Sequence, residues 1–188
     1  MSQFQLFPVV HVKSKCTAAV KIISPQDFIF LDTSTISIAV AEILAKSETP
    51  YKILTNMIDV LVILSRNPKI NIIFAGGQIN KSRDGFSDGL SLEFMSRFRP
   101  DISFIGVVGA SVKKNSLSNN NVETGLYKAK MLELSKKSYV MAESRKLGVE
   151  GNYSFATFEN VCGLITEREP APGILAAAKK INLEIILT

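Results

Sequence analysis

The sequence predicts an α/β domain, in which a mostly parallel sheet is flanked by helices. Short apolar runs alternate along the chain with segments whose apolar residues recur at helical spacing. Most of the short runs end in Gly, Ser, Thr or Asn, which are typical of the turns that follow strands. Strands and helices that alternate in this order form parallel sheets with right-handed crossovers.

The first strand and the helix after it carry the clearest pattern. Residues 28–31, FIFL, form an apolar run that follows the turn signal Ser24-Pro25. Asp32 ends this run, and apolar residues then recur every three or four positions from 36 to 44. A buried strand followed by an amphipathic helix is therefore expected here.

The remaining elements are predicted from the same two patterns. Further strands are expected at residues 51–54, 70–75, 102–108, 138–142, 161–165 and 183–187. Further helices are expected at residues 14–23, 57–64, 89–98, 125–137 and 174–180. The polar segments between them are expected to be a loop or hairpin at 78–88, a mobile flap at 113–121 and an irregular stretch at 146–158.

The chain of 188 residues is expected to form one domain, residues 14–188, after an N-terminal arm of residues 1–13. Its hydrophobic fraction of 46% and charged fraction of 21% suit a globular protein with a full core. No apolar run approaches the roughly 20 residues that span a membrane, and the N-terminus lacks a signal-peptide pattern. We therefore expect a cytoplasmic protein without a membrane partner.

The sequence predicts neither a metal site nor a cofactor site. Cys16 and Cys162 lie far apart without a CxxC pair, which argues against zinc and against a disulfide in the cytosol. His11 is the only histidine, which argues against a histidine metal site and a Ser–His or Cys–His relay. The net charge of +5 attracts acidic partners, but the basic residues form scattered pairs and favour nucleic acid only weakly.

Polar residues between the first strand and its helix form a candidate anion site. Thr33, Ser34 and Thr35 follow Asp32, and the helix begins directly after them. A helix N-terminus presents free N–H groups and a partial positive charge, and hydroxyls add donors, so this position suits a phosphate or carboxylate. An ordinary N-cap explains the same residues, because Ser, Thr and Asp are preferred there. The local pattern leaves both interpretations open.

Further candidates follow from the rule that ligands of open parallel sheets bind beyond the carboxyl ends of the strands. Asn56 and Gly76–Gly77 end two of the predicted strands. Glu123 is expected just before a helix and Lys128 one turn inside it, from where an ammonium group could reach a phosphate. For Lys128 and Lys146 alike, a solvated surface lysine is the alternative interpretation.

Six short motifs occur in order along the chain, namely LDTSTIS (31–37), LTN (54–56), IIFAGGQI (72–79), ISFIGVVG (102–109), ETGLYKAKM (123–131) and AESRKLG (142–148). Together they resemble the effector-sensing domain of the DeoR family of bacterial sugar-metabolism repressors. The similarity runs from about Lys15 to the C-terminus. Each motif is short, but their common order and family-like spacing make the resemblance specific.

The resemblance implies a fold related to ribose-5-phosphate isomerase and a pocket for a phosphorylated sugar. The residues that it assigns to this pocket are Asp32, Thr33, Ser34, Thr35, Ile36, Asn56, Gly76, Gly77, Glu123, Lys128 and Lys146. Residues 32–36 would hold the phosphate, and Asn56 with the two glycines would line the pocket. Glu123 and the two lysines would contact the sugar or its phosphate.

The chain departs from the family pattern at three places. Ser34 replaces the usual glycine of the phosphate loop, and because serine lacks the freedom of glycine at positive φ, a reshaped loop is expected. Glu143 replaces the usual aspartate. Only about 27 residues precede the first strand, too few for the winged helix-turn-helix of roughly sixty residues with which family members normally begin. We therefore expect either a sensor domain cut from a longer protein or a natural stand-alone sensor.

The predicted function is the effector-binding domain of a DeoR-type transcriptional regulator, not an enzyme. It would self-associate and bind a phosphorylated sugar, with DNA contacted only through a helix-turn-helix module that this chain lacks. The first alternative is a sugar-phosphate isomerase in which Glu123 or Asp59 acts as base and Lys128 polarises a carbonyl. The second is an interaction protein that forms heterodimers with full-length regulators.

Overall fold

The computed structural model describes residues 19–82 and 84–187. The predicted arm of residues 1–13, His11 and Cys16 lie outside the described residues. The helix expected at 14–23 is described only from residue 19, and residues 19–22 are helical.

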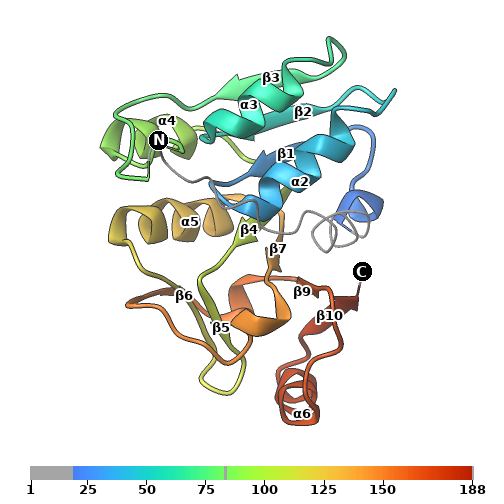
Figure 1. Cartoon of the computed structure of the whole chain (residues 1–188), viewed down its shortest axis with the longest axis vertical. Coiled ribbons are helices and arrows are strands. Elements are labelled where there is room, and N and C mark those ends of the chain that lie inside the picture. The colour runs from blue at the N-terminus through green and yellow to red at the C-terminus, as the bar shows by residue number, and fades with distance from the viewer. Residues whose placement is uncertain (1–18, 83, 188) are drawn as a thin grey trace, which may run out of the picture.

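A seven-stranded sheet forms the centre of the domain and confirms the predicted α/β class (Figure 1). Its strands lie in the order β10-β9-β7-β4-β1-β2-β3, and each neighbouring pair is parallel. They are β1 (Phe28–Leu31), β2 (Lys52–Thr55), β3 (Asn71–Phe74), β4 (Ile102–Gly106), β7 (Lys137–Met141), β9 (Gly163–Thr166) and β10 (Glu184–Leu187). Since all seven run in one direction, their carboxyl ends meet at one edge of the sheet.

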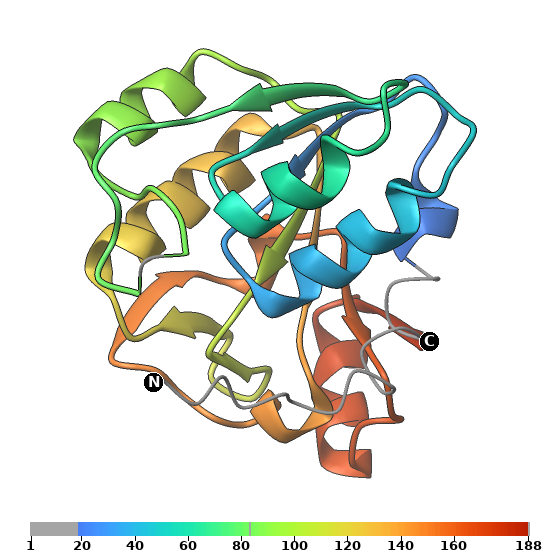
Figure 2. The same cartoon turned by 45° about the horizontal axis from the view of Figure 1, so that its top comes forward.

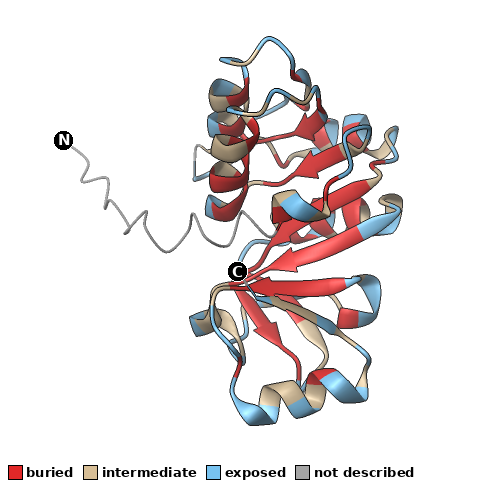
Figure 3. Cartoon of the chain, turned by 90° about the vertical axis from the view of Figure 1, so that its right-hand side faces the viewer, coloured by how far each residue is buried: buried red, intermediate tan, exposed pale blue. Residues whose placement is uncertain are grey.

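Helices cover both faces of this sheet (Figure 2). The helices on one face are α2 (Thr35–Leu44) and α3 (Ile58–Leu64), and those on the other are α4 (Gly89–Ser96), α5 (Val122–Leu134) and α6 (Pro172–Lys180). Strand β1 shows how the sequence builds two cores: Ile29 and Leu31 pack with α2 and α3, whereas Phe30 packs with α4 and α5. The central strands are accordingly buried along their length (Figure 3). In the described part of the chain, no helix is both long and apolar enough to cross a membrane.

The prediction of a mobile flap at 113–121 is wrong. Part of this segment is strand β6 (Ser116–Asn119), which pairs antiparallel with β5 (Gly109–Ser111) on one side and β8 (Tyr153–Ala156) on the other. Leu117 is fully buried, and its polar neighbours Ser118 and Asn119 are buried with it. The polar pattern indicates a loop because the burial of this strand comes from two partner strands rather than from its own apolar residues.

Several other boundaries also differ from the predicted ones. Helix α5 begins at Val122 rather than at 125, because Asn121 caps it by accepting a hydrogen bond from the Thr124 N–H at 2.9 Å. Glu123 therefore lies inside the helix and not before it. The segment 146–158, predicted to be irregular, contains β8, and the short 3-10 helices Ser144–Lys146 and Phe158–Asn160 lie at its two ends. The run 102–108 ends as a strand at Gly106, and β5 begins three residues later.

Candidate functional site

A cavity of about 370 Å³ lies at the carboxyl ends of the central strands. This is the position at which open parallel sheets bind their ligands, and the volume falls in the usual range of small-molecule sites. Most of the residues that line the cavity are polar, and they come from loops that follow β1, β2, β3, β4, β6 and β7. The lining residues include Thr33, Ser34, Thr35, Ile36, Met57, Asn80, Ser82, Asp84, Gly106, Asn119, Asn120, Asn121, Thr124, Lys128 and Lys146.

The loop between β1 and α2 is both a helix cap and a wall of the cavity. Ser34 is the N-cap of α2, and its side chain accepts a hydrogen bond from the Ser37 N–H at 3.3 Å. The residues of the first helical turn, Thr35 and Ile36, face the same cavity as Thr33 and Ser34. The N-cap interpretation is therefore confirmed, and it places a helix N-terminus at the cavity.

The expectation that Ser34, in place of the usual glycine, reshapes this loop is wrong. Its backbone is extended, with φ −140° and ψ 151°, a conformation that any residue adopts. Its hydroxyl donates to Asp32 Oδ1 at 2.6 Å. Serine is thus accommodated by the loop without backbone strain.

Asp32 and Lys128 form a buried ion pair directly behind the loop. The distance from Lys128 Nζ to Asp32 Oδ2 is 3.0 Å, and the side chains are 3% and 0% exposed. Asp32 also accepts hydrogen bonds from the Ser37 hydroxyl at 2.7 Å and the Gly106 N–H at 2.8 Å. Lys128 Nζ donates to the Gly106 carbonyl at 2.6 Å. Asp32 therefore fixes the loop rather than lining the cavity, and it balances the charge that Lys128 brings to the wall.

Tyr127 holds the same loop from the neighbouring position of α5. Its phenolic oxygen accepts a hydrogen bond from the Thr33 N–H at 3.2 Å and also contacts the Thr33 hydroxyl. Burial raises the pKa of Tyr127, and the Asp32 carboxylate raises it further, so the phenol is neutral at physiological pH. Two consecutive residues of α5 thus bind the β1–α2 loop, one through Thr33 and the other through Asp32.

Lys146 supplies a second ammonium group to the wall. Its Nζ donates to the Val107 carbonyl at 2.9 Å and lies 3.9 Å from Glu143 Oε1. Burial lowers the pKa of Lys146, and the Glu143 carboxylate partly offsets this effect. The side chain remains 24% exposed, so its charge is available to a ligand in the cavity.

Charge is distributed unevenly across the cavity. Among its described lining residues, the charged side chains are Lys128, Lys146 and Asp84. Lys146 follows β7. Asp84 lies near the end of β2, because its carbonyl accepts a hydrogen bond from the Ile58 N–H at 3.0 Å, just beyond that strand. These strands are three positions apart in the sheet, which corresponds to about 14 Å at the usual strand spacing. One side of the cavity is therefore cationic and the other carries a carboxylate.

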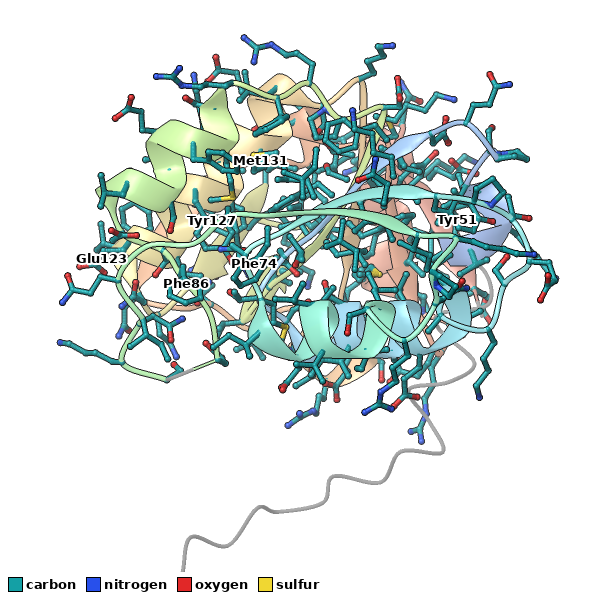
Figure 4. The ribbon with its side chains drawn as sticks, turned by 90° about the horizontal axis from the view of Figure 1, so that it is seen from above. Tyr51, Phe74, Phe86, Glu123, Tyr127 and Met131 are labelled. Atoms are coloured by element: carbon teal, nitrogen blue, oxygen red, sulfur yellow. The ribbon has the colours of Figure 1, made fainter. Side chains whose placement is uncertain are left out.

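Five of the residues assigned to the pocket by resemblance do not line this cavity, namely Asp32, which lies behind the loop, and the four described next. Asn56 is buried and donates from Nδ2 to the Phe86 carbonyl at 2.6 Å. The Gly76 carbonyl accepts from the Ser91 hydroxyl at 2.8 Å, and Gly77 lies where a Cβ atom would collide with the Asp88 side chain. Glu123 is exposed at the periphery of the molecule, whereas Tyr127 lies further inside (Figure 4).

Sequence reasoning missed the amide-rich wall of the cavity. Asn119, Asn120 and Asn121 line it, with Thr124 one turn into α5. A usable signal was present, because an asparagine directly before a helical pattern is an N-cap preference and places the start of α5 at the carboxyl edge of the sheet. No cluster of His, Cys, Asp and Glu that could hold a metal ion occurs among the described residues.

The fold and the cavity together define an α/β domain that is suited to binding a small anionic ligand. The sequence model of the DeoR C terminal sensor domain matches residues 13–168. The chain therefore belongs to the family of DeoR C-terminal sensor domains, as its motifs predicted.

Relatives of known role are transcriptional repressors and not enzymes. The chain is 28% identical over 170 residues to the HTH-type transcriptional repressor GlcR of Bacillus subtilis, covering 90% of this chain and 64% of that protein. It is 26% identical over 160 residues to the glycerol-3-phosphate regulon repressor of Escherichia coli K12, covering 85% and 62%. The chain thus spans less than two thirds of the length of either repressor. The names of both relatives describe transcriptional repressors, in agreement with the family assignment.

Solved structures confirm the expected fold. Ribose 5-phosphate isomerase A of Methanocaldococcus jannaschii superposes with a TM-score of 0.55 at 12% identity, over 75% of this chain and 55% of that one. The E249D mutant of RipA superposes with a TM-score of 0.63 at 11% identity, over 98% and 55%. At these identities the similarity concerns the fold alone.

Proposed function

We propose that the cavity binds a phosphorylated sugar and that this ligand modulates repression by the complete regulator. The carrying observation is that the N-terminus of α2, with Thr33 to Ile36, and the ammonium group of Lys146 line one cavity. Backbone N–H groups, hydroxyls and a cation are the donors that phosphate prefers. The name of one relative supports a small phosphate ester of a polyhydroxy compound, since that protein represses a glycerol-3-phosphate regulon.

The uneven charge of the cavity gives the ligand an orientation. The phosphate lies on the side of Lys146 and the β1–α2 loop, because a carboxylate at Asp84 repels it from the opposite side. The sugar hydroxyls then face Asn80, Asn119 and Asp84, whose amide and carboxylate groups can donate to and accept from them. Regulation follows by linkage: the ligand favours the conformation or oligomer to which it binds more tightly, and an attached DNA-binding module responds to that shift.

The isomerase alternative has no support in the site. Neither Glu123 nor Asp59, the two residues considered as base, lines the cavity, and both are exposed in the first turn of their helices. The Lys128 ammonium is already bonded to Asp32 and to the Gly106 carbonyl. A proton-transferring pair is therefore not assembled among the described residues of the cavity.

A thermal-shift panel tests the proposal. Sugar phosphates are compared with their unphosphorylated parents, and each mixture is analysed afterwards for isomerised product. A ligand at a hundred times its dissociation constant stabilises the folded state by about 2.7 kcal/mol. Stabilisation by a phosphate ester but not by its parent sugar, without turnover, is expected. Turnover would support an enzyme, and no shift with any phosphate ester would contradict the proposal.

Replacing Asn119 by alanine is expected to weaken binding of the sugar phosphate about five- to tenfold, since one hydrogen bond to the sugar is lost. Asn119 is 7% exposed, and its Oδ1 accepts from the Asn120 N–H at 2.8 Å, which leaves the amide nitrogen for the ligand. Affinity for inorganic phosphate should change less than about threefold. Calorimetric titration measures both, and Asn152→Ala, an exposed amide outside the cavity, is the control.

The affinity for a phosphate ester is expected to fall at alkaline pH. The Lys146 ammonium attracts phosphate only while it is protonated, and burial lowers its pKa below the usual 10.5, so the loss begins at a pH below that value. Lys146→Arg keeps its charge above pH 12 and should move the loss to higher pH. The exposed Lys130, changed to Arg, should leave the profile unaltered. Titrations between pH 7.5 and 10.5 measure this, and coincident curves for wild type and Lys146→Arg would contradict it.

A further inference from the structure

Helices α4 and α5 lie side by side on the outside of the sheet, on the face opposite to α2 and α3 (Figures 1 and 2). Of the eight large apolar side chains that are exposed in the described part of the chain, four belong to these two helices. They are Leu90, Phe94, Val122 and Leu126. A groove of about 520 Å³ runs between the helices and is lined by Leu92, Leu126 and Ala129 among others. Exposed apolar side chains gathered in this way are typical of an interaction surface.

The charges on this surface identify a suitable partner. The chain as a whole carries a net charge of +5, which disfavours the association of two copies. The α4–α5 surface does not share this positive charge, because Arg97 and Lys130 are paired with Glu93 and Glu133. Glu123 adds a negative charge that has no ion pair among the described residues. Net positive charge therefore does not oppose the docking of a second copy at this surface.

The spacing of residues on α5 is complementary to itself. Relative to Leu126, Lys130 lies about 6 Å toward the C-terminus and Glu123 about 4.5 Å toward the N-terminus, both rotated to the same flank of the helix. Val122 and Ala129 occupy the opposite flank at equivalent heights. If two α5 helices pack antiparallel about a twofold axis at Leu126, then Leu126 meets its own copy, and Lys130 lies opposite Glu123 of the second copy. Val122 then packs on Ala129, so apolar side chains meet apolar and opposite charges meet.

We propose that α5, together with the adjoining groove, is the surface on which a second copy of this chain docks to form a twofold homodimer. The buried side of the same helix carries Tyr127 and Lys128, which bind the β1–α2 loop. Dimerisation and the cavity therefore share one helix. The proposal does not depend on the identity of any ligand, and its test uses none.

The mass of the whole chain in solution tests this surface. Sedimentation velocity at chain concentrations from about 1 to 200 μM is expected to show a monomer–dimer equilibrium. Leu126→Glu should raise the dimer dissociation constant about 30-fold or more, because it buries two carboxylates at the axis. Val62→Glu, on α3 and 49% exposed, is the matched control and should change it less than about twofold. A wild-type monomer at every concentration, or an unchanged dimer in Leu126→Glu, would overturn the proposal.

Charge reversal tests the antiparallel register. Glu123→Lys and Lys130→Glu should each weaken the dimer about five- to tenfold, since each places like charges opposite one another. The double variant exchanges the two charges and should return the dissociation constant to within about threefold of wild type. Thermal unfolding confirms that each variant is folded. A double variant no better than the single ones would overturn this register.

Discussion

Replacing Lys128 by methionine is expected to lower the free energy of unfolding by about 3–5 kcal/mol. The substitution removes the cation beside Asp32, whose carboxylate is fully buried, and an uncompensated buried charge is costly. Hydrogen bonds from Ser37 and the Gly106 N–H remain, which places the expected loss toward the lower end of this range. Urea denaturation followed by circular dichroism measures the change.

Two variants control this measurement. Lys114→Met changes an exposed lysine away from the cavity and from the α4–α5 surface, and it should alter stability by less than about 0.5 kcal/mol. The double variant Asp32→Asn with Lys128→Met removes both charges and should recover more than half of the loss. If Lys128→Met unfolded at the same urea concentration as wild type, the ion pair would not hold the β1–α2 loop in place.

Gly106→Ala is expected to abolish binding of the phosphate ester and to destabilise the domain by about 1–3 kcal/mol. A Cβ atom at this position would collide with Ser34 Cβ and lie 2.7 Å from Ser34 Oγ. Because Gly106 ends β4 and is fixed by the sheet, the loop has to move instead. That movement displaces the N-terminus of α2 from the cavity. Thermal unfolding and calorimetric titration measure the two effects.

Gly76→Ala is the matched control, because a Cβ atom there meets nothing within 4 Å. It should leave both stability and affinity near those of wild type. Combining Gly106→Ala with Ser34→Gly removes the atoms that collide, at a cost of only a few tenths of a kcal/mol for the changed N-cap. Binding should return in this double variant. Full affinity in Gly106→Ala alone would show that the loop tolerates the displacement.

The parts of the fold that the sequence predicts well are those whose burial is visible in their own residues. Strand β1 and helix α2 have apolar residues at strand and helix spacing, so both were predicted within one residue. Strand β6 was not, because Ser118 and Asn119 are buried by pairing with β5 and β8. Those partner strands lie elsewhere in the chain, and no local pattern reports such pairing.

The residues of the candidate site also fall into those whose position the sequence predicts and those whose position depends on contacts between distant segments. Thr33 to Ile36 and Lys146 line the cavity as expected, since the β1–α2 turn and the end of β7 follow directly from predicted strands. Asp32 and Lys128 carry roles that composition does not reveal, because their pairing depends on where α5 crosses the end of β4. Glu123 does not line the cavity and lies in the first turn of α5, because Asn121, rather than a later residue, caps this helix.

The small antiparallel sheet of β5, β6 and β8 affects the order in which the parts of the cavity form while the chain is synthesised. Asn119 is held in the cavity wall by β8, where it pairs with Tyr153, and Leu117 pairs with Ala156. The β1–α2 loop leaves the ribosome more than a hundred residues earlier. The residues of this loop emerge first, but Tyr127 and Lys128, which hold the loop, emerge only shortly before β8, so the loop and the Asn119 wall become fixed late in synthesis. A nascent chain that stops short of β8 therefore lacks the strand that fixes Asn119 in the cavity wall.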